Sequence, residues 1–343
     1  MTMQMKKMNR LRAGSAIAVA GIMTLGVAGC SSSNSDDTSS GNTAEVAEVT
    51  IEDNHGTYTI SVPPTAVAVT DNRLFETLAD WGVDLVAAPL SLIPDTITAY
   101  TSETVGADLG SHREADLETL VAADPDLVIN GQRFVQYYDD IVSLVPDATV
   151  IELDPRDEEP FDQELIRQIE ILGQIFQKED EANQLIYDFE ASIERLKVAY
   201  EALGAPVIAT VITSGSSINY SAPGTGRTFG EWYDILGWNA AIEATEASSD
   251  DHEGDEISVE TIAAANPAWI LVMDRDAAVS ANSGEDYTPA SELISDSSAL
   301  QNVMAVQEGN IAYMPADTYT NESIQTYIEF FNSLAQQMEE AAQ

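Results

Sequence analysis

Three arginine residues occupy positions from which an anionic ligand could be bound. Arg133 and Arg275 each lie in a loop just past a predicted buried strand, and Arg227 lies in a loop rich in glycine. Arginine keeps its positive charge, donates hydrogen bonds in a planar fork and stacks on aromatic rings. Ligands of open α/β sheets bind beyond the carboxyl ends of the strands. We therefore expect these guanidinium groups to face an anionic ligand.

The elements that would position two of these arginines form an internal repeat. Residues 117–129, LETLVAADPDLVI, are matched after a shift of 142 positions by residues 259–271, VETIAAANPAWIL. Each copy has the pattern of a short amphipathic helix, a turn marked by Asp-Pro or Asn-Pro, and a buried strand. Arg133 and Arg275 are also 142 positions apart. The repeat predicts two lobes of similar α/β construction.

Further predicted strands alternate with helical stretches, which favours parallel sheets with crossover helices. These strands are Val67–Val69, Leu85–Ala88, Thr149–Leu153, Val207–Thr213 and Ile311–Met314. Between the two copies, residues 180–203 carry apolar side chains at a sustained three-four spacing, until Gly204 and Pro206 end the pattern. A helix of this length spans ~36 Å, enough to bridge two lobes. The predicted fold class is α/β, with two Rossmann-like lobes that have central, mostly parallel sheets and are joined by one long α-helix.

The N-terminal segment has the pattern of an export signal. Four basic residues precede an apolar and small-residue run over residues 13–29, which is short for a membrane span of roughly 20 residues. The run ends in Val-Ala-Gly before Cys30, which resembles the lipobox of bacterial lipoproteins. The resemblance implies a signal peptide over residues 1–29 and a diacylglyceryl group on Cys30. The alternative is an uncleaved anchor with an incidental cysteine, although Cys30 is the only cysteine in the chain.

The chain after the signal peptide is expected to have four parts. Residues 30–48 are rich in Ser, Thr, Asn and Asp, which predicts a flexible tether. The remainder is long enough for two cores. We expect an N-terminal lobe over residues 49–179, an interlobe helix over 180–203 and a C-terminal lobe over 204–343. The lipid would hold a monomer on the outer face of the cytoplasmic membrane.

The charge and the histidines argue against several functions. Four of the 14 Lys and Arg residues lie in the signal segment, which leaves ten against 58 Asp and Glu residues. So negative a chain disfavours binding to nucleic acids and anionic lipids. The same excess of carboxylates offers each arginine an alternative role in an ion pair. The three histidines, His55, His112 and His252, are widely spaced, which argues against a catalytic triad and a bare zinc or manganese site.

The chain resembles the ferric-siderophore-binding lipoproteins of bacterial ABC importers, which are helix-linked (class III) periplasmic-type binding proteins. The resemblance covers residues 49–343 and includes the phrases DLETLVAADPDLVIN and ISVETIAAANPAWILVMDR. The segment NYSAPGTGRTFG, residues 219–230, is similar to a loop and helix of the catecholate-type subgroup. The resemblance implies that the protein captures an iron(III)-siderophore, of catecholate or mixed catecholate type. It also implies that the protein has no intrinsic cofactor and catalyses no reaction.

The resemblance also implies which residues bind the ligand. Arg133, Arg227 and Arg275 correspond to the ligand-binding arginines of the family, and Tyr220 lies in the matching loop. In lobe one the match is imperfect, because Gln132 separates Arg133 from the preceding glycine, whereas many relatives have the arginine directly after it. The alternative for each arginine is an ion pair with a carboxylate.

Two further residues correspond to iron ligands of the subgroup. His252 and Tyr319 match a histidine and a tyrosine that close onto iron, and imidazole and phenolate suit Fe(III) when the siderophore supplies only four of six donors. One extra residue separates His252 from Gly254 compared with the family pattern. The alternatives are an exposed histidine in an acidic loop and an ordinarily buried tyrosine.

Glu118 and Glu260, again 142 positions apart, correspond to glutamates with which this class docks onto its permease. One carboxylate on each lobe would suit a two-fold ABC permease dimer, which works with ATPase subunits. The alternative is a pair of solvated glutamates that complement the dipoles of their helices.

Other functions stay open on sequence alone. A haem- or cobalamin-binding protein of the same class would need an axial donor over a large apolar pocket and would not call for three arginines. An enzyme would need a nucleophile and a base that the scattered histidines do not supply. A non-transport surface lipoprotein could keep the fold without a ligand.

Overall fold

The computed structural model describes residues 47–283 and 286–343. The predicted signal peptide (1–29) and Cys30 lie outside the described residues. Strand β1 begins at Ala47, where Ala47 pairs with Val62, so the predicted tether over residues 30–48 extends two residues too far. No described helix is both long enough and apolar enough to cross a membrane.

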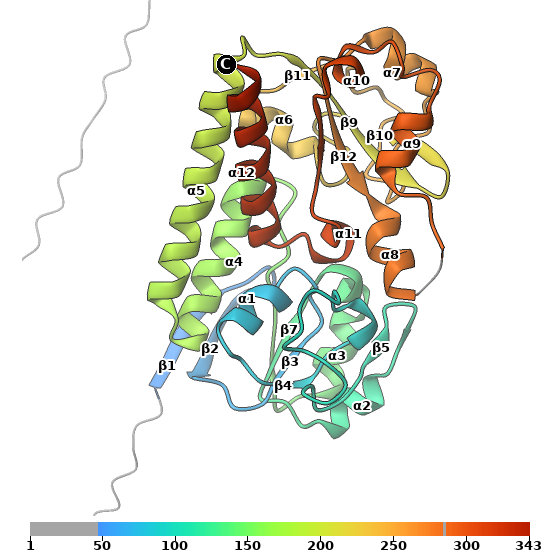
Figure 1. Cartoon of the computed structure of the whole chain (residues 1–343). Coiled ribbons are helices and arrows are strands. Elements are labelled where there is room, and N and C mark those ends of the chain that lie inside the picture. Colours follow the sequence, from blue (N-terminus) through green and yellow to red (C-terminus); the bar gives the residue numbers. More distant parts are fainter. Residues whose placement is uncertain (1–46, 284–285) are drawn as a thin grey trace, which may run out of the picture. The chain divides into compact units, whose positions relative to one another are not determined.

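A four-stranded parallel sheet with the order β4-β3-β7-β8 forms the centre of the N-terminal lobe (Figure 1). Its strands are β3 (Val67–Val69), β4 (Leu85–Ala87), β7 (Leu127–Asn130) and β8 (Thr149–Glu152). The helices of this lobe are α1 (Phe75–Asp80), α2 (Leu117–Ala122) and α3 (Tyr138–Leu144), with 3-10 helices at Leu90–Leu92 and Gln132–Tyr137. Two hairpins complete it: β1 (Ala47–Glu52) with β2 (Thr57–Val62), and β5 (Gly110–Ser111) with β6 (Glu114–Ala115). All side chains of β3 and β7 are buried, as expected where a parallel sheet is covered on both faces.

A second sheet, with the order β10-β9-β12-β13, forms the centre of the C-terminal lobe. Its strands are β9 (Val207–Ser214), β10 (Ser217–Tyr220), β11 (Asn239–Ala240), β12 (Trp269–Asp274) and β13 (Ile311–Tyr313). The surrounding helices are α6 (Gly230–Leu236), α7 (Val259–Ala265), α8 (Arg275–Ser283), α9 (Ala290–Asp296), α10 (Met304–Glu308) and α11 (Thr318–Asn321). Only β10 pairs in the antiparallel sense in this sheet as described. The two sheets confirm the predicted α/β class with mostly parallel strands.

The long helix predicted over residues 180–203 is α5 (Glu179–Ala202), shifted by one residue at each end. It packs along α4 (Phe161–Phe176) and α12 (Ile324–Ala341), as Figure 1 shows. Its buried positions include Phe189, Ile193 and Leu196, which follow the predicted apolar spacing. One apolar cluster combines side chains of these three helices with side chains of both sheets. The helix layer therefore shares a core with each lobe.

The internal repeat corresponds to two matching units, α2 with β7 and α7 with β12. Asp116 caps α2 by accepting a hydrogen bond from Thr119 N, and Ser258 caps α7 by accepting one from Thr261 N. The turns that follow contain Asp124 and Asn266 in the left-handed region, with φ of 49° and 48°. Asp and Asn tolerate this conformation better than most residues. The repeated sequence thus produces repeated structure, including its caps and turns.

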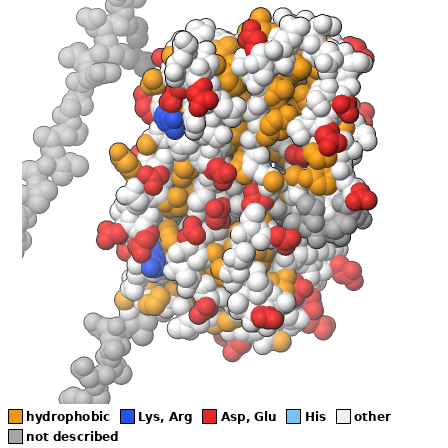
Figure 2. All heavy atoms as spheres, viewed as in Figure 1, with side chains coloured by type: hydrophobic (Ala, Val, Ile, Leu, Met, Phe, Trp, Pro, Cys, Tyr) orange, Lys and Arg blue, Asp and Glu red, His pale blue; other side chains and the backbone are white. Residues whose placement is uncertain are grey.

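Acidic side chains are spread widely over the face drawn in Figure 2, and basic side chains are sparse there. This agrees with the excess of Asp and Glu in the sequence.

Candidate ligand-binding site

Arg133 and Arg275 follow the carboxyl ends of the matching strands β7 and β12. The prediction that both lie in loops is wrong, because the chain enters a helical turn directly after each strand. Arg133 lies in the 3-10 helix Gln132–Tyr137, and Arg275 is the first residue of α8. After β7 the change of direction is made at Gln132, whose φ is 52°. Both arginines nevertheless lie at the sheet edges where the sequence places them.

The segment that carries Arg133 is fixed against its own sheet. The backbone N–H of Gln132 donates to Asp154 Oδ2 at 2.8 Å. Gly131 lies against Asp71, since a Cβ added at Gly131 would lie 2.5 Å from Asp71 Oδ2. A glycine is therefore required at this position, and Arg133 leaves the sheet from a well-defined point.

Arg227 lies in a compact loop before α6. Ser221 Oγ donates to the Arg227 carbonyl at 2.8 Å, and Gly230 N–H donates to Gly226 O at 2.7 Å. A Cβ on Gly226 would overlap the backbone of Ala222, so the loop can fold this tightly only with glycine there. This close packing explains why glycine stands at position 226.

Three guanidinium groups converge on one tyrosine ring. The Cζ atoms of Arg133, Arg227 and Arg275 lie 4.9, 5.1 and 4.9 Å from the centre of the Tyr319 ring. These distances are within the range in which a cation is attracted to an aromatic ring. Tyr319 belongs to α11 and is 4% exposed. Residues from both lobes thus meet at one buried phenol.

The surroundings of Tyr319 lower the pKa of its hydroxyl. Burial alone would raise the pKa of its hydroxyl. The positive charge of Arg133, a hydrogen bond from Arg275 and the charge of Arg227 outweigh burial, and the pKa is lowered. A phenolate in this position is a suitable oxygen donor for a hard cation such as Fe(III).

The three arginines keep part of their hydrogen-bonding capacity free. The Nε atoms of Arg133, Arg227 and Arg275 are all buried without a hydrogen-bond partner. Arg133 Nη2 donates to the Tyr319 carbonyl at 3.3 Å and forms no ion pair with a carboxylate of the described residues. Because buried donors without partners are costly, these groups are suited to an incoming acceptor.

Ion pairing, the alternative role for the arginines, applies to two of the three. Arg275 Nη1 lies 3.5 Å from Asp276 Oδ1, and Arg227 Nη2 lies 3.2 Å from Glu322 Oε2. Neither carboxylate prevents the guanidinium group from lying beside Tyr319. Each of these two arginines therefore contacts both a carboxylate and the Tyr319 ring.

A buried ion-pair network lies beside the site and was not predicted from the sequence. Arg73 Nη1 lies 3.2 Å from Asp154 Oδ1, and Arg73 Nη2 lies 3.8 Å from Glu322 Oε2. Burial alone would raise the pKa of Glu322, but the charges of Arg227 and Arg73 lower it, so this carboxylate is ionised. One signal was present in the sequence: Arg73 follows β3 as Arg133 follows β7.

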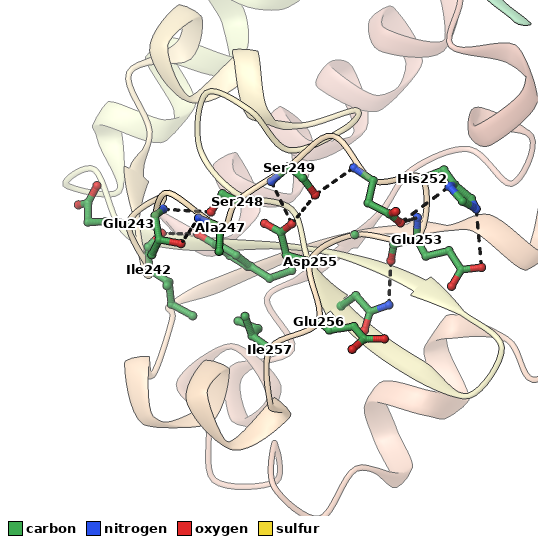
Figure 3. A pocket seen from close by; sticks show the side chains of 15 residues that line it. Ile242, Glu243, Ala247, Ser248, Ser249, His252, Glu253, Asp255, Glu256 and Ile257 are labelled. Carbon is green, nitrogen blue, oxygen red and sulfur yellow. Dashed lines mark hydrogen bonds and ion pairs between the residues drawn. The ribbon is translucent and has the colours of Figure 1, made fainter.

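Tyr220 and His252 lie in a different place from the arginines. Both line a pocket of about 630 Å³ in the C-terminal lobe, formed largely by the segment 242–257 (Figure 3). Tyr220 is buried, its hydroxyl donates to the Ile242 carbonyl, and burial raises its pKa to about 12. The His252 side chain is 51% exposed, with Asp251 and Glu253 each 3.8 Å from its ring nitrogens.

The described residues do not bring the two predicted iron donors together. No hydrogen bond or ion pair within the described part of the chain links His252 to Tyr319 or to the three arginines. Nor do three or more His, Cys, Asp or Glu side chains in that part form a group that could hold a metal ion. Tyr319 is therefore the predicted iron donor that lies at the arginine cluster.

The sequence pattern of one known family, periplasmic binding protein, matches residues 67–318, which is most of the chain. The chain belongs to the periplasmic binding protein family. The matched range includes both sheets, Arg133, Arg227 and Arg275.

Two curated relatives of this periplasmic binding protein are similar along most of their length. The petrobactin-binding protein YclQ of Bacillus subtilis is 26% identical over 291 residues, which cover 83% of this chain and 86% of the relative. The ferric-anguibactin-binding protein FatB of Vibrio anguillarum is 25% identical over 272 residues, which cover 79% and 81%.

Solved structures agree on the fold. The crystal structure of YclQ from Bacillus subtilis aligns with a TM-score of 0.72 and 22% identity, over 85% of this chain and 99% of that one. The periplasmic catecholate-siderophore binding protein VctP from Vibrio cholerae gives 0.72 and 22%, over 84% and 100%. These likenesses establish that the two-lobed architecture is that of periplasmic binding proteins.

Glu118 and Glu260 of this binding protein occupy equivalent places on the two lobes. Each lies in the first turn of its capped helix, α2 or α7, and each side chain is exposed. They are available to a partner, and they also lie where a carboxylate complements a helix dipole. The position is compatible with both interpretations of the sequence.

Proposed function

We propose that this periplasmic binding protein captures an iron(III)-siderophore, of catecholate or mixed catecholate type, and delivers it to the permease of an ABC importer. The observation that carries the proposal is the convergence of Arg133, Arg227 and Arg275 on the ring of Tyr319. A catecholate offers an aromatic face, as the Tyr319 ring does, and also anionic oxygens. Guanidinium groups bind both features.

The charges of ligand and site are complementary. A ferric tris-catecholate carries about three negative charges, and the site gathers three arginines whose Nε atoms lack partners. The names of the relatives support a ligand of this kind, since FatB is named for a ferric ligand. The ligand would bind to the guanidinium groups that lie around Tyr319 in this structure.

Tyr319 and His252 are proposed to complete the iron shell when a siderophore supplies only four donors. The lowered pKa of Tyr319 supports its part. For His252, support comes from its loop, because Asp250 lines a pocket of about 300 Å³ together with Arg227 and Glu322. His252, two residues further on, would have to turn from its exposed position toward the iron. Tyr220 would support this loop by its hydrogen bond to Ile242.

The proposed transport role also includes the partner and the membrane. Glu118 and Glu260 would dock onto a permease dimer that works with ATPase subunits, one glutamate per lobe. A signal peptide over residues 1–29 and lipid on Cys30 would hold the protein at the outer face of the membrane as a monomer. The protein would act by binding and release, without catalytic chemistry of its own.

The test is a tryptophan-fluorescence titration of residues 31–343 with a ligand panel. Trp232 is a suitable reporter, because it lies in α6 after the Arg227 loop and packs 4.7 Å from Phe331 between ring centres. The panel contains ferric catecholates of four and six donors, a ferric hydroxamate, haem and iron-free siderophore. We expect saturable quenching by a ferric catecholate below micromolar concentration. Response to haem alone would transfer the protein to the haem-binding branch, and no response at all would contradict ligand transport.

A further inference from the structure

Glu322 is a carboxylate shared by arginines of the two lobes. Its Oε2 atom lies 3.2 Å from Arg227 Nη2 and 3.8 Å from Arg73 Nη2, and Thr228 Oγ1 donates to its Oε1 atom at 2.6 Å. Its side chain is 4% exposed. A buried carboxylate with two arginines and a hydroxyl around it has little freedom to move, so it fixes the groups that it contacts.

The backbone of Glu322 ties this carboxylate to Tyr319. Glu322 ends α11, three residues after Tyr319, and its N–H donates to Thr318 O at 3.0 Å. Its φ is 44°, in the left-handed region that glutamate rarely adopts. A residue kept in such a conformation indicates that its surroundings determine its position. The phenol and the carboxylate are thus held on one short segment.

Arg73 connects the same carboxylate to the N-terminal lobe. Besides its ion pair with Asp154, Arg73 contacts the side chain of Gln132. When the Gln132 amide is oriented with its oxygen toward Arg73, that oxygen accepts hydrogen bonds from Nη1 at 3.0 Å and from Nη2 at 2.7 Å. Gln132 directly precedes Arg133. A continuous set of contacts therefore runs from the Arg133 segment through Gln132, Arg73 and Glu322 to Arg227.

We propose that Glu322 is a positioning residue that holds Arg227 in the ligand site and, through Arg73, links it to the arginine segment of the other lobe. Gln132, the residue that separates Arg133 from its glycine, belongs to this link. The inference rests on the proposed function in so far as Arg227 binds the siderophore. It adds that Arg227 and the N-terminal lobe are coupled through one buried carboxylate.

Replacing the carboxylate separates positioning from simple charge. Glu322→Gln removes one negative charge near the site, which by electrostatics alone would strengthen the binding of an anion. If Glu322 positions Arg227, the same change instead weakens the binding of a six-donor ferric tris-catecholate, by about tenfold to a hundredfold. If the wild type binds the complex and Glu322→Gln binds it equally well or more tightly, the positioning role is overturned and the proposed function stays intact.

Two companion variants control this comparison. Glu164→Gln removes a similarly buried carboxylate that also contacts two arginines, Arg156 and Arg167, but does so within one lobe. It should leave the affinity within about twofold, although it disturbs the fold in a similar way. Glu322→Asp keeps the charge with a shorter reach, and aspartate tolerates a positive φ better than glutamate. Its affinity should lie between those of wild type and Glu322→Gln, and an affinity as low as that of Glu322→Gln would contradict a role for the charge.

The link between the lobes can be tested without any ligand. Arg73→Gln and Arg227→Gln are measured singly and together by urea unfolding. Each change is expected to raise the equilibrium constant for unfolding by some factor. If both arginines act through Glu322, the factor for the double variant should be smaller than the product of the two single factors, by about threefold or more. In the Glu322→Gln background the two changes should become additive. Additivity already in the wild-type background would overturn the link, whatever the protein binds.

Discussion

Tyr319 combines two properties that different ligands would use differently. Its ring lies beside three guanidinium groups, and its hydroxyl has a lowered pKa despite burial, because the charge of Arg133 and a hydrogen bond from Arg275 favour the phenolate. A siderophore with six donors leaves no iron position free. A siderophore with four donors leaves two, and the phenolate oxygen can fill one of them.

Tyr319→Phe should therefore discriminate between the two kinds of complex. The variant keeps the ring among the arginines and removes only the oxygen. We expect the affinity for a four-donor ferric catecholate to fall by about tenfold or more, as for loss of a charged partner, and that for a six-donor complex to change by less than about threefold. Fluorescence titration with both complexes measures this. Equal losses for both would show that the hydroxyl does not act through the iron.

The residues of the network around Glu322 mark a limit of prediction from sequence. Arg133, Arg227 and Arg275 could be selected because they follow strands or lie in a glycine-rich loop, and they do meet at Tyr319. Arg73 and Glu322 are 249 positions apart, and no periodicity or repeat relates them. Their contact depends on how the two lobes face each other, which a linear pattern does not contain.

Among the elements, the end of strand β3 carries a buried acid with an unusual titration. Burial and the nearby charge of Asp154 raise the pKa of Asp71 to about 7, although Arg73 opposes the shift. Its Oδ2 atom has no hydrogen-bond partner, and it lies against Gly131. Asp71 thus retains a proton in the folded protein at pH values where the unfolded chain has lost it.

Asp71→Asn should change how stability depends on pH. Between about pH 4 and 7 the folded protein binds up to one more proton at Asp71 than the unfolded chain does, so the contribution of Asp71 to wild-type stability falls as the pH rises through this window. Asparagine has no such proton. The free energy of unfolding of the variant relative to wild type should therefore increase from pH 4.5 to pH 7, by on the order of 1 kcal/mol or more. Urea unfolding at both pH values measures the difference; a constant difference would contradict the raised pKa.

The paired helices α2 and α7 present Glu118 and Glu260 in their exposed first turns. Charge reversal at both, Glu118→Arg with Glu260→Arg, should abolish iron delivery to cells that carry the cognate permease. Ligand affinity should stay the same, and stability should change by less than about 1 kcal/mol, because both side chains are exposed. Uptake of labelled iron and a binding titration measure the two effects. Glu190→Arg on the exposed face of α5 is the control, and uptake equal to that control would exclude the docking role.

Elements were predicted more completely than loops. The repeat gave the two helix-strand units because their apolar spacing, caps and turn residues all recur after 142 positions. The long helix α5 followed from its apolar face. The segment 242–257 has no such period, so its folding around a separate pocket, with Tyr220 and His252 in the wall, could not be predicted. Helical turns at Arg133 and Arg275 were missed because they begin without a separating loop.

At the scale of the whole molecule, the net charge opposes the proposed ligand. The chain has 58 acidic and 14 basic residues, so its long-range field repels an anionic complex. Salt screens this field beyond about 8–10 Å at physiological ionic strength, whereas the arginines act at contact.

The association rate should therefore rise with salt. We expect the rate constant for a ferric tris-catecholate to increase severalfold between about 0.01 M and 0.15 M NaCl, the opposite of the usual behaviour for a cationic site and an anionic ligand. Stopped-flow fluorescence measures it, with an uncharged ferric hydroxamate as the control for general salt effects. A rate constant that falls with salt would show that attraction by the arginines outweighs repulsion by the net negative charge even at long range.

In the proposed function, Arg133, Arg227 and Arg275 together hold the ferric complex. The most direct test compares the dissociation constant of a ferric tris-catecholate for wild type and for the variant with all three changed to glutamine. We expect submicromolar binding by wild type and a loss of affinity of at least about a thousandfold in the variant, because three charged contacts are removed. A control variant with Lys178, Arg195 and Lys197 changed to glutamine alters the net charge equally and should bind as wild type does. Equal affinity of the arginine variant and the control would show that these three arginines do not hold the ferric complex.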